Sequence, residues 1–197
     1  MAGLFFFILA AQLMVVLMLA GSIALGYDFN QGAISDLGVI DETFWLFNSS
    51  LVLTGVLNLA AALLLVRSRR SLPVLFVYGL ASVGAIGAGL IHLGNPWHGI
   101  FALLAFLFFN IETLVGAIRL KGAIRWIGIG LGTLGLIYVV VMFIGDSGQP
   151  AIFGAIGHGG SERMIVYPPM LWLMVFGGYL MARREALPAL GLAIDRA

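Results

Sequence analysis

Long apolar segments alternate with short polar segments along the whole chain of 197 residues. Six of the apolar segments are each long enough to cross the hydrocarbon core of a membrane, which takes about 20 helical residues. The predicted transmembrane helices span about residues 4–26, 44–66, 72–93, 97–118, 124–145 and 163–181. This pattern predicts an all-α fold, in which residues 1–197 form one integral membrane domain built as an antiparallel bundle of six transmembrane helices.

Composition supports a membrane-embedded chain. Apolar residues make up 61% of the sequence and charged residues 10%, which is too little polar surface to cover a water-soluble domain of this length. The chain has no cysteine, so disulfides and thiolate metal sites are excluded. We therefore expect a multi-pass protein of the cell membrane that carries no cofactor.

Charged residues divide unevenly between the two ends of the predicted bundle. Nine of the ten Lys and Arg residues fall on the side of the N-terminus: Arg67, Arg69, Arg70, Arg119, Lys121, Arg125, Arg183, Arg184 and Arg196. Because positively charged loops stay in the cytoplasm, both termini are predicted to be cytoplasmic. The opposite side carries Asp28, Asp36, Asp41, Glu42, Asp146 and Glu162, with Arg163 as its only cation. An acidic face repels anionic polymers, so nucleic acid is not an expected partner.

The stretch from Gly157 to Trp172 leads from a polar loop into the last apolar segment and contains the isolated cation. An arginine on the acidic side requires a partner, and we expect Glu162, Asp36 or an anionic ligand such as a lipid phosphate. Ser161 is predicted to cap the sixth helix, and Pro168-Pro169 is predicted to bend or loosen it. The candidate ligand site on this face comprises Asp36, Asn48, His98, Glu162 and Arg163.

Asn48 and the three histidines have alternative interpretations. Asn48 lies inside an apolar segment, where it either bonds a neighbouring helix or faces a polar cavity. His92, His98 and His158 are weak candidates for metal ligands, since their spacing matches no metal-binding motif. We expect no metal, and an interfacial hydrogen-bonding role for these side chains.

Gln12, Asn58 and Glu112 lie at similar depths in the predicted helices and suggest a polar layer inside the membrane. One interpretation is a proton or cation pathway through Glu112. The other is a neutral Glu112 that bonds Asn58, Gln12 or Asn110, or extends toward the cytoplasm. A carboxylate at this depth costs about 3 kcal/mol unless it is paired or hydrated, so we expect Glu112 to be uncharged at pH 7.

Small residues recur at four-residue spacing in two of the predicted helices: Ala81, Ala85 and Gly89, then Gly84 and Ala88, then Gly128 and Gly132. Such stripes let helix backbones approach closely. They indicate tight packing within the bundle or, alternatively, docking of other membrane-protein subunits.

Several motifs resemble those of one family, in the same order along most of the chain. They are the runs 34–38 (ISDLG), 47–51 (FNSSL) with Gly55, His98-Gly99 with 103–106 (LLAF), and Glu162-Arg163 through Tyr167-Pro168 and Leu171-Trp172 to 176–180 (FGGYL). They resemble the archaeal and bacterial "domain of unknown function 998" family. The resemblance implies a six-helix membrane protein without an established activity. That family is loosely similar to the Frag1, DRAM and Sfk1 group, whose members are linked to lipid remodelling and phospholipid organisation.

Three functions are consistent with these patterns. The first is binding of lipid headgroups on the acidic side, where Arg163 holds a phosphate and membrane lipids are the partners. Binding is favoured over catalysis because no activated Ser or Cys nucleophile stands out. The second is a structural or accessory subunit of a larger membrane complex. The third is a proton-coupled transporter that uses Glu112, although the six segments show no clear internal repeat.

Overall fold

The computed structural model describes residues 1–66 and 71–189, with side chains as far as Arg183. Within these ranges the chain forms six α-helices and two short 3-10 helices: α1 (Ala2–Ile23), η1 (Ile34–Gly38), α2 (Phe44–Val66), α3 (Leu72–Leu90), α4 (His98–Ala117), α5 (Ala123–Asp146), η2 (Pro150–Ile156) and α6 (Gly157–Ala189). The predicted all-α bundle is confirmed. The predictions about Arg67, Arg69, Arg70 and Arg196, and about the side chain of Arg184, lie outside the described residues.

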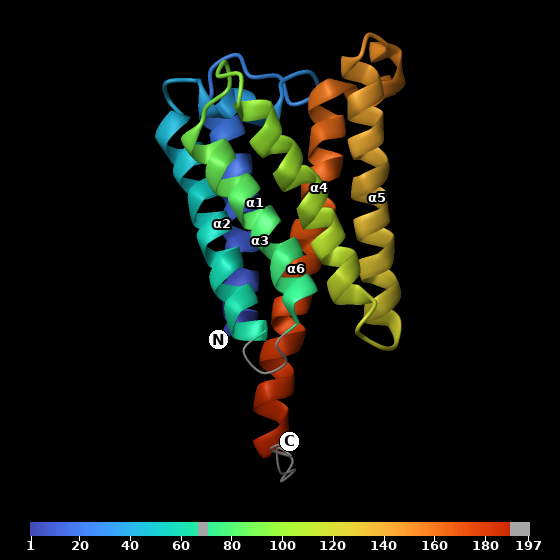
Figure 1. The fold of residues 1–197 in the computed structure, drawn as a ribbon. Coiled ribbons are helices and arrows are strands. Elements are labelled where there is room, and N and C mark those ends of the chain that lie inside the picture. Colours follow the sequence, from blue (N-terminus) through green and yellow to red (C-terminus); the bar gives the residue numbers. More distant parts are fainter. Residues whose placement is uncertain (67–70, 190–197) are drawn as a thin grey trace.

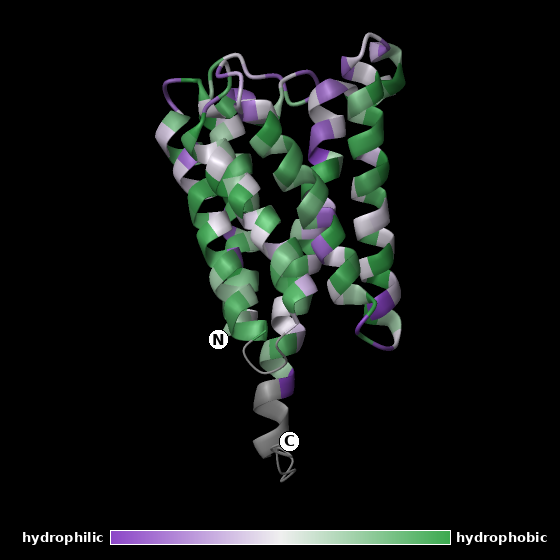
Figure 2. Cartoon of the chain, in the orientation of Figure 1, coloured by the Kyte–Doolittle hydropathy of each residue, from purple (hydrophilic) through white to green (hydrophobic). Residues whose placement is uncertain are grey.

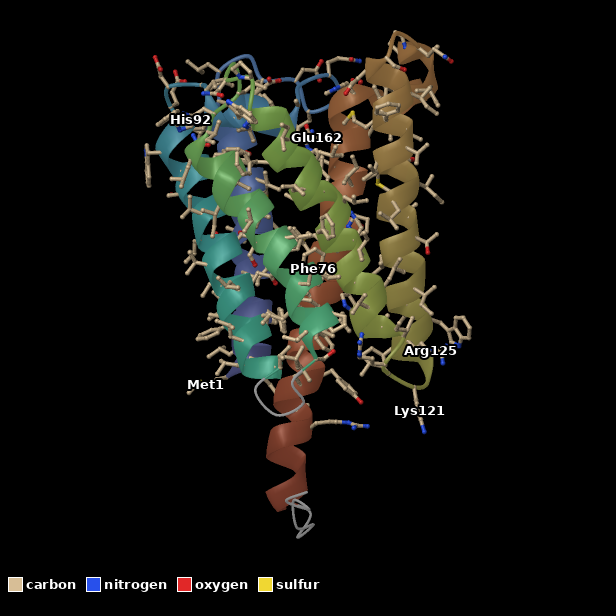
Figure 3. The ribbon with its side chains drawn as sticks, in the orientation of Figure 1. Met1, Phe76, His92, Lys121, Arg125 and Glu162 are labelled. Atoms are coloured by element: carbon tan, nitrogen blue, oxygen red, sulfur yellow. The ribbon has the colours of Figure 1, made fainter. Side chains whose placement is uncertain are left out.

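The helices form an up-and-down bundle in which each α-helix packs against the next along the chain (Figure 1). The last helix, α6, packs against α1, α4 and α5. The start of α1 lies at the same end of the bundle as Lys121 and Arg125, whereas His92 and Glu162 lie at the other end (Figure 3). We call these the basic end and the acidic end. The assignment of the basic end to the cytoplasm remains a prediction.

The helices are apolar along most of their length, and polar residues gather mainly at the two ends of the bundle (Figure 2). All six α-helices are long and apolar enough to cross a membrane. Three tryptophans near the helix ends are largely exposed: Trp45 (68%), Trp97 (63%) and Trp126 (67%). Exposed tryptophan at both ends is typical of the two membrane–water interfaces.

The small-residue stripes bring helices within the chain into close contact, as the first of their two interpretations predicts. Gly55 of α2 lies outside these stripes but packs in the same way, since a Cβ atom built on it would lie 2.6 Å from the Ser82 carbonyl oxygen of α3. One built on Gly89 of α3 would lie 2.7 Å from the Asn48 carbonyl oxygen. Gly84 lies directly against the backbone of Ala105 in α4. These glycines therefore set the separation of α2, α3 and α4.

The sixth helix begins earlier than predicted, at Gly157, and continues to Ala189. The prediction that Ser161 caps it is wrong, because the Ser161 hydroxyl lies inside the helix and donates to the Gly157 carbonyl at 2.9 Å. The cap comes instead from a distant loop: the amides of Gly159 and Gly160 donate to the Asn30 carbonyl at 2.8 and 3.3 Å. The first helical turn is thus stabilised by a loop that follows α1.

Pro168 and Pro169 do not end α6. Because Pro169 has no N–H group, it leaves the carbonyl of Ile165, four residues earlier, without its helical partner. The side-chain amide of Asn110 in α4 donates to this carbonyl at 3.1 Å. Asn110 therefore supplies the hydrogen bond that the proline removes, and α6 crosses the bundle as one helix.

Candidate functional site

A cavity of about 460 Å³ opens at the acidic end, between α4, α5, α6 and the segment that contains η1. One part of its wall is polar and consists of Ser35, Asp36, His98, Asp146, His158 and Glu162. The rest is apolar and includes Leu93, Ala102, Leu103, Phe106, Val139, Met142, Phe143 and Ile165. We call it the acidic-end cavity.

Two of its carboxylates hold the first residues of η1. Glu162 lies one turn into α6, is 4% exposed, and accepts a hydrogen bond from the backbone N–H of Ile34. Asp36 lies within η1 and accepts from the backbone N–H of Ala33 at 2.8 Å. Each carboxyl group thus satisfies a backbone N–H at the start of η1. These two hydrogen bonds hold Glu162 and Asp36 on the same wall of the cavity.

The two histidines of the cavity are held by different partners. His98 is the first residue of α4, and its Nδ1 lies 2.6 Å from the carbonyl oxygen of Ile91. A carbonyl oxygen only accepts, so Nδ1 carries the proton and Nε2 is the acceptor when the ring is neutral. His158 Nε2 lies 3.3 Å from an Asp146 carboxylate oxygen, which joins the end of α5 to the start of α6.

Arg163 does not line this cavity. Its Nη1 donates to the carbonyls of Gly159 (2.8 Å), Phe29 (3.0 Å) and Gly32 (3.3 Å), and its Nη2 donates to the hydroxyl of Tyr27 (2.6 Å). The guanidinium carbon also lies 5.0 Å from the centre of the Phe29 ring. The loop of residues 27–33 thus wraps the guanidinium, and we call this loop the strap.

The expectation that Arg163 pairs with Glu162 or Asp36 is therefore corrected. The alternative of an anionic ligand stays a prediction. Successive residues of an α-helix point in different directions, so Glu162 and Arg163 face different neighbours in the first turns of α6. Glu162 faces η1 and the cavity, while Arg163 faces the strap. Carbonyl oxygens and aromatic faces satisfy the cation without a carboxylate.

Tyr27 completes the enclosure of Arg163. Burial raises the pKa of the Tyr27 phenol above its ordinary value, and the hydrogen bond from Arg163 opposes this shift. The phenol therefore stays protonated, and its hydroxyl lies 2.8 Å from the carbonyl oxygen of Ala33 and 3.1 Å from that of Gly32. The Tyr27 hydroxyl therefore accepts a hydrogen bond from Arg163 and donates one to a carbonyl of the strap.

Asn48 also lies outside the cavity lining. Its side-chain amide donates to the carbonyl of Gly38, the last residue of η1, at 2.8 Å. Asn48 thus anchors the C-terminal end of η1, as Glu162 and Asp36 anchor its start. Its role is to hold the segment that carries Asp36.

The three residues of the expected polar layer belong to two separate clusters. Gln12 of α1 donates to the Thr54 hydroxyl at 2.7 Å and accepts from the Ser50 hydroxyl at 2.8 Å. Asn58 of α2 donates to a Glu112 carboxyl oxygen at 2.8 Å. Asn58 and Glu112 are both 0% exposed. Of the alternatives for Glu112, the hydrogen bond to Asn58 is confirmed.

Replacing Glu112 with Gln is expected to change the free energy of unfolding by less than about 1 kcal/mol, because a side-chain amide keeps an oxygen that accepts from Asn58. Replacing it with Leu is expected to cost about 2 kcal/mol, since the Asn58 amide then loses this acceptor. Unfolding of both variants in mixed micelles, followed by circular dichroism, measures the difference. A loss of about 2 kcal/mol in the Gln variant as well would contradict the expectation that an amide can replace this carboxyl group.

The histidines do not gather into a metal site. His92 packs against the Phe44 ring, with the ring centres 4.6 Å apart, and does not line the cavity. Among the residues that the structure describes, no three His, Asp or Glu side chains lie close enough together to hold a metal ion.

The structure thus brings together three of the five predicted site residues, Asp36, His98 and Glu162. It adds His158, considered above only as a metal ligand, and Asp146. The sequence does contain a signal for this pair, since Asp146 ends the fifth apolar segment and His158 lies just before the sixth. Two residues that flank one loop of a helical hairpin lie at the same depth in the bundle.

Comparison with known families gives one match. A family model described as "Protein of unknown function (DUF998)" matches residues 7–179. Neither the comparison with curated proteins nor the comparison with solved structures gives a match. The matched region begins in α1, includes η1 and the whole acidic-end cavity, and ends in α6. Because it covers most of the chain and confirms the resemblance seen in the motifs, this multi-pass helical protein belongs to the DUF998 family.

Proposed function

We propose that the acidic-end cavity binds the headgroup of a membrane lipid, and that this headgroup carries an amine. The supporting observation is the chemistry of the lining. Three carboxyl groups and two imidazoles face the cavity, and none of its lining residues is a Lys or Arg. Carboxylates accept hydrogen bonds and attract cations, whereas they repel a phosphate or a carboxylate. A primary ammonium supplies three donors and a positive charge.

The position of the opening supports a lipid rather than a water-soluble ligand. Leu103 of α4 is 52% exposed and Phe143 of α5 is 75% exposed, and both also line the cavity. Apolar side chains that are exposed on these helices face the hydrocarbon of the bilayer. In this proposal the mouth lies between α4 and α5 and opens toward lipid. Its volume of about 460 Å³ falls in the range of small-molecule sites, about 300–1,000 Å³.

The phosphate-binding role of Arg163 gains no support from its contacts, since the strap already surrounds its guanidinium. The accessory-subunit hypothesis gains none from the small-residue stripes, because Gly84, Gly89 and Gly132 pack inside the chain. In the transporter hypothesis the key residue is Glu112, whose hydrogen-bond partner is Asn58. The headgroup site is the function for which the contacts give the most support.

The test is a comparison of lipid retention by two matched variants. In Glu162→Gln the cavity loses an ionisable carboxyl group while an oxygen still accepts from the Ile34 N–H. We expect this variant to retain about ten-fold less phosphatidylethanolamine than the wild type, because a charge-assisted hydrogen bond is lost. Native mass spectrometry of purified protein, equilibrated with phosphatidylethanolamine and phosphatidylglycerol of the same acyl chains, measures retention.

Glu42→Gln is the matched control, since Glu42 is an exposed acid of the same end that does not line the cavity. This control is expected to retain lipid as the wild type does. Equal retention of phosphatidylethanolamine by Glu162→Gln and Glu42→Gln would overturn the proposal. So would a preference of the wild type for phosphatidylglycerol that Glu162→Gln leaves unchanged.

A further inference from the structure

A second cavity lies at the basic end, between the end of α2, the start of α3, the end of α4 and the middle of α6. Its volume is about 320 Å³. Its polar wall contains Arg119, in the turn after α4, and Arg183 of α6, together with Ser71, Tyr78 and Tyr179. We call it the basic-end pocket. It shares no lining residue with the acidic-end cavity.

Both arginines are exposed and lie where the pocket meets the surface. Arg119 Nη1 donates to the Val115 carbonyl at 2.6 Å, and the Arg183 guanidinium carbon lies 4.9 Å from the centre of the Tyr179 ring. Of the carboxylates whose side chains the structure describes, none lies within 4.0 Å of either guanidinium. A guanidinium has five N–H donors, so each side chain keeps donors for a ligand. Two cations at one opening, which no described carboxylate pairs, attract an anion.

The floor of the pocket offers a further donor. Tyr78 is 1% exposed, lines the pocket, and has its hydroxyl beside Gly116, where a Cβ atom would lie 3.3 Å from it. A buried phenol hydroxyl is well suited to donate to an anion that the arginines hold from above. Glu112, the buried acid closest in sequence to this wall, does not line the pocket and bonds Asn58.

We propose that the basic-end pocket binds a phosphate group, with Arg119 and Arg183 as its cationic ligands and Tyr78 as a donor from the floor. Guanidinium groups match phosphate oxygens in pairs, and basic pockets between transmembrane helices bind anionic headgroups. The apolar part of the wall, which includes Val74, Phe176 and Leu180, continues from the arginines into the bundle. This chemistry fits the headgroup of an anionic phospholipid and also a free phosphate ester. The two ends of the bundle would then select headgroups of opposite charge.

The test uses the full chain in a non-ionic detergent and compares three probes: phosphatidic acid, phosphatidylcholine of the same acyl chains, and glycerol phosphate. Binding is followed by native mass spectrometry for the lipids and by calorimetry for glycerol phosphate. We expect the double variant Arg119→Gln/Arg183→Gln to bind phosphatidic acid about ten-fold more weakly than the wild type does. Tyr78→Phe, which removes only the hydroxyl, is expected to weaken phosphatidic acid binding by a smaller factor.

Lys121→Gln/Arg125→Gln is the matched control, because it removes the same charge from the same end outside the pocket lining. This control is expected to bind phosphatidic acid like the wild type. Loss of glycerol phosphate binding in the Arg119/Arg183 variant would support the site with a soluble ester as its ligand, and loss for phosphatidic acid alone would support a lipid. Equal weakening by the two double variants would overturn the proposal, since it would show attraction to the whole basic surface. Unchanged binding in the Arg119/Arg183 variant would also overturn it.

Discussion

Replacing Gly159 with Ala is expected to destabilise the protein by about 2–3 kcal/mol, because the first turn of α6 has no room for a side chain. A Cβ atom at this position would overlap the Gly32 carbonyl oxygen and would lie 2.9 Å from the Phe29 carbonyl oxygen. Both are backbone atoms of the strap, so they move only if the strap leaves α6. The hydrogen bond from the Gly159 amide to Asn30 would then be lost as well. Unfolding in mixed micelles, followed by circular dichroism, measures the change.

Gly178→Ala is the matched control for this prediction. Gly178 lies later in the same helix, and a Cβ atom there would meet nothing within 4 Å. Because Ala is a better helix former than Gly, this variant is expected to be unchanged or up to about 1 kcal/mol more stable. The two substitutions are chemically identical and are expected to act in opposite directions. The same loss of stability in both would mean that the strap does not contact α6 at Gly159.

Replacing Arg163 with Gln is expected to destabilise the protein by about 3 kcal/mol, because several charge-assisted hydrogen bonds and a contact between the cation and aromatic rings are lost together. Gln is shorter and does not span the carbonyls of Phe29 and Gly32 and the hydroxyl of Tyr27. Hydrogen–deuterium exchange is expected to accelerate at the amides of Gly159 and Gly160, which bond the Asn30 carbonyl. Exchange measured by mass spectrometry on peptides that cover residues 157–166 reports this local opening.

Lys121→Gln serves as the control for Arg163→Gln, since it also removes one cation and Lys121 is exposed at the other end of the bundle. This control is expected to leave both stability and exchange unchanged. Arg163→Lys tests the geometry, because an ammonium lacks the planar fork that reaches several acceptors at once. Full recovery of stability by Lys would contradict the interpretation that the strap recognises the guanidinium.

The number and placement of the helices follow from the sequence alone, because each apolar segment is long enough to span a membrane and is bounded by polar residues. The start of α6 does not follow from it. Local rules favour Ser161 as a cap, but the carbonyl of Asn30, far away in the chain, supplies the acceptor. A contact between two loops leaves no local pattern. The continuity of α6 at Pro169 also depends on a group from another helix, the side-chain amide of Asn110.

The residues of the candidate site could be predicted from the sequence where their depth along the bundle alone determines which residues lie together. Asp36, His98 and Glu162 come from segments that end at the same side of the membrane, and they line one cavity. The partner of Arg163 was not predictable from its neighbour Glu162, since adjacent residues on a helix diverge. The same limit applies to Gln12 and Glu112, which lie at similar depths but on helices that face different neighbours. The depth of a residue limits which partners it can reach, and the packing of the helices determines which of these partners it contacts.

The central claim, that an amine-bearing lipid enters between α4 and α5, is tested most directly by photo-crosslinking in lipid nanodiscs. The probe is phosphatidylethanolamine with a diazirine on an acyl carbon near the ester, and mass spectrometry maps the labelled residues. We expect cross-links to concentrate around Leu103 and Phe143, which line the cavity and are exposed on the surface of the bundle. A phosphatidylglycerol probe of the same chains is expected to label these positions less. Even labelling of all the lipid-facing helices, or equal labelling of α4 and α5 by the two probes, would contradict the account.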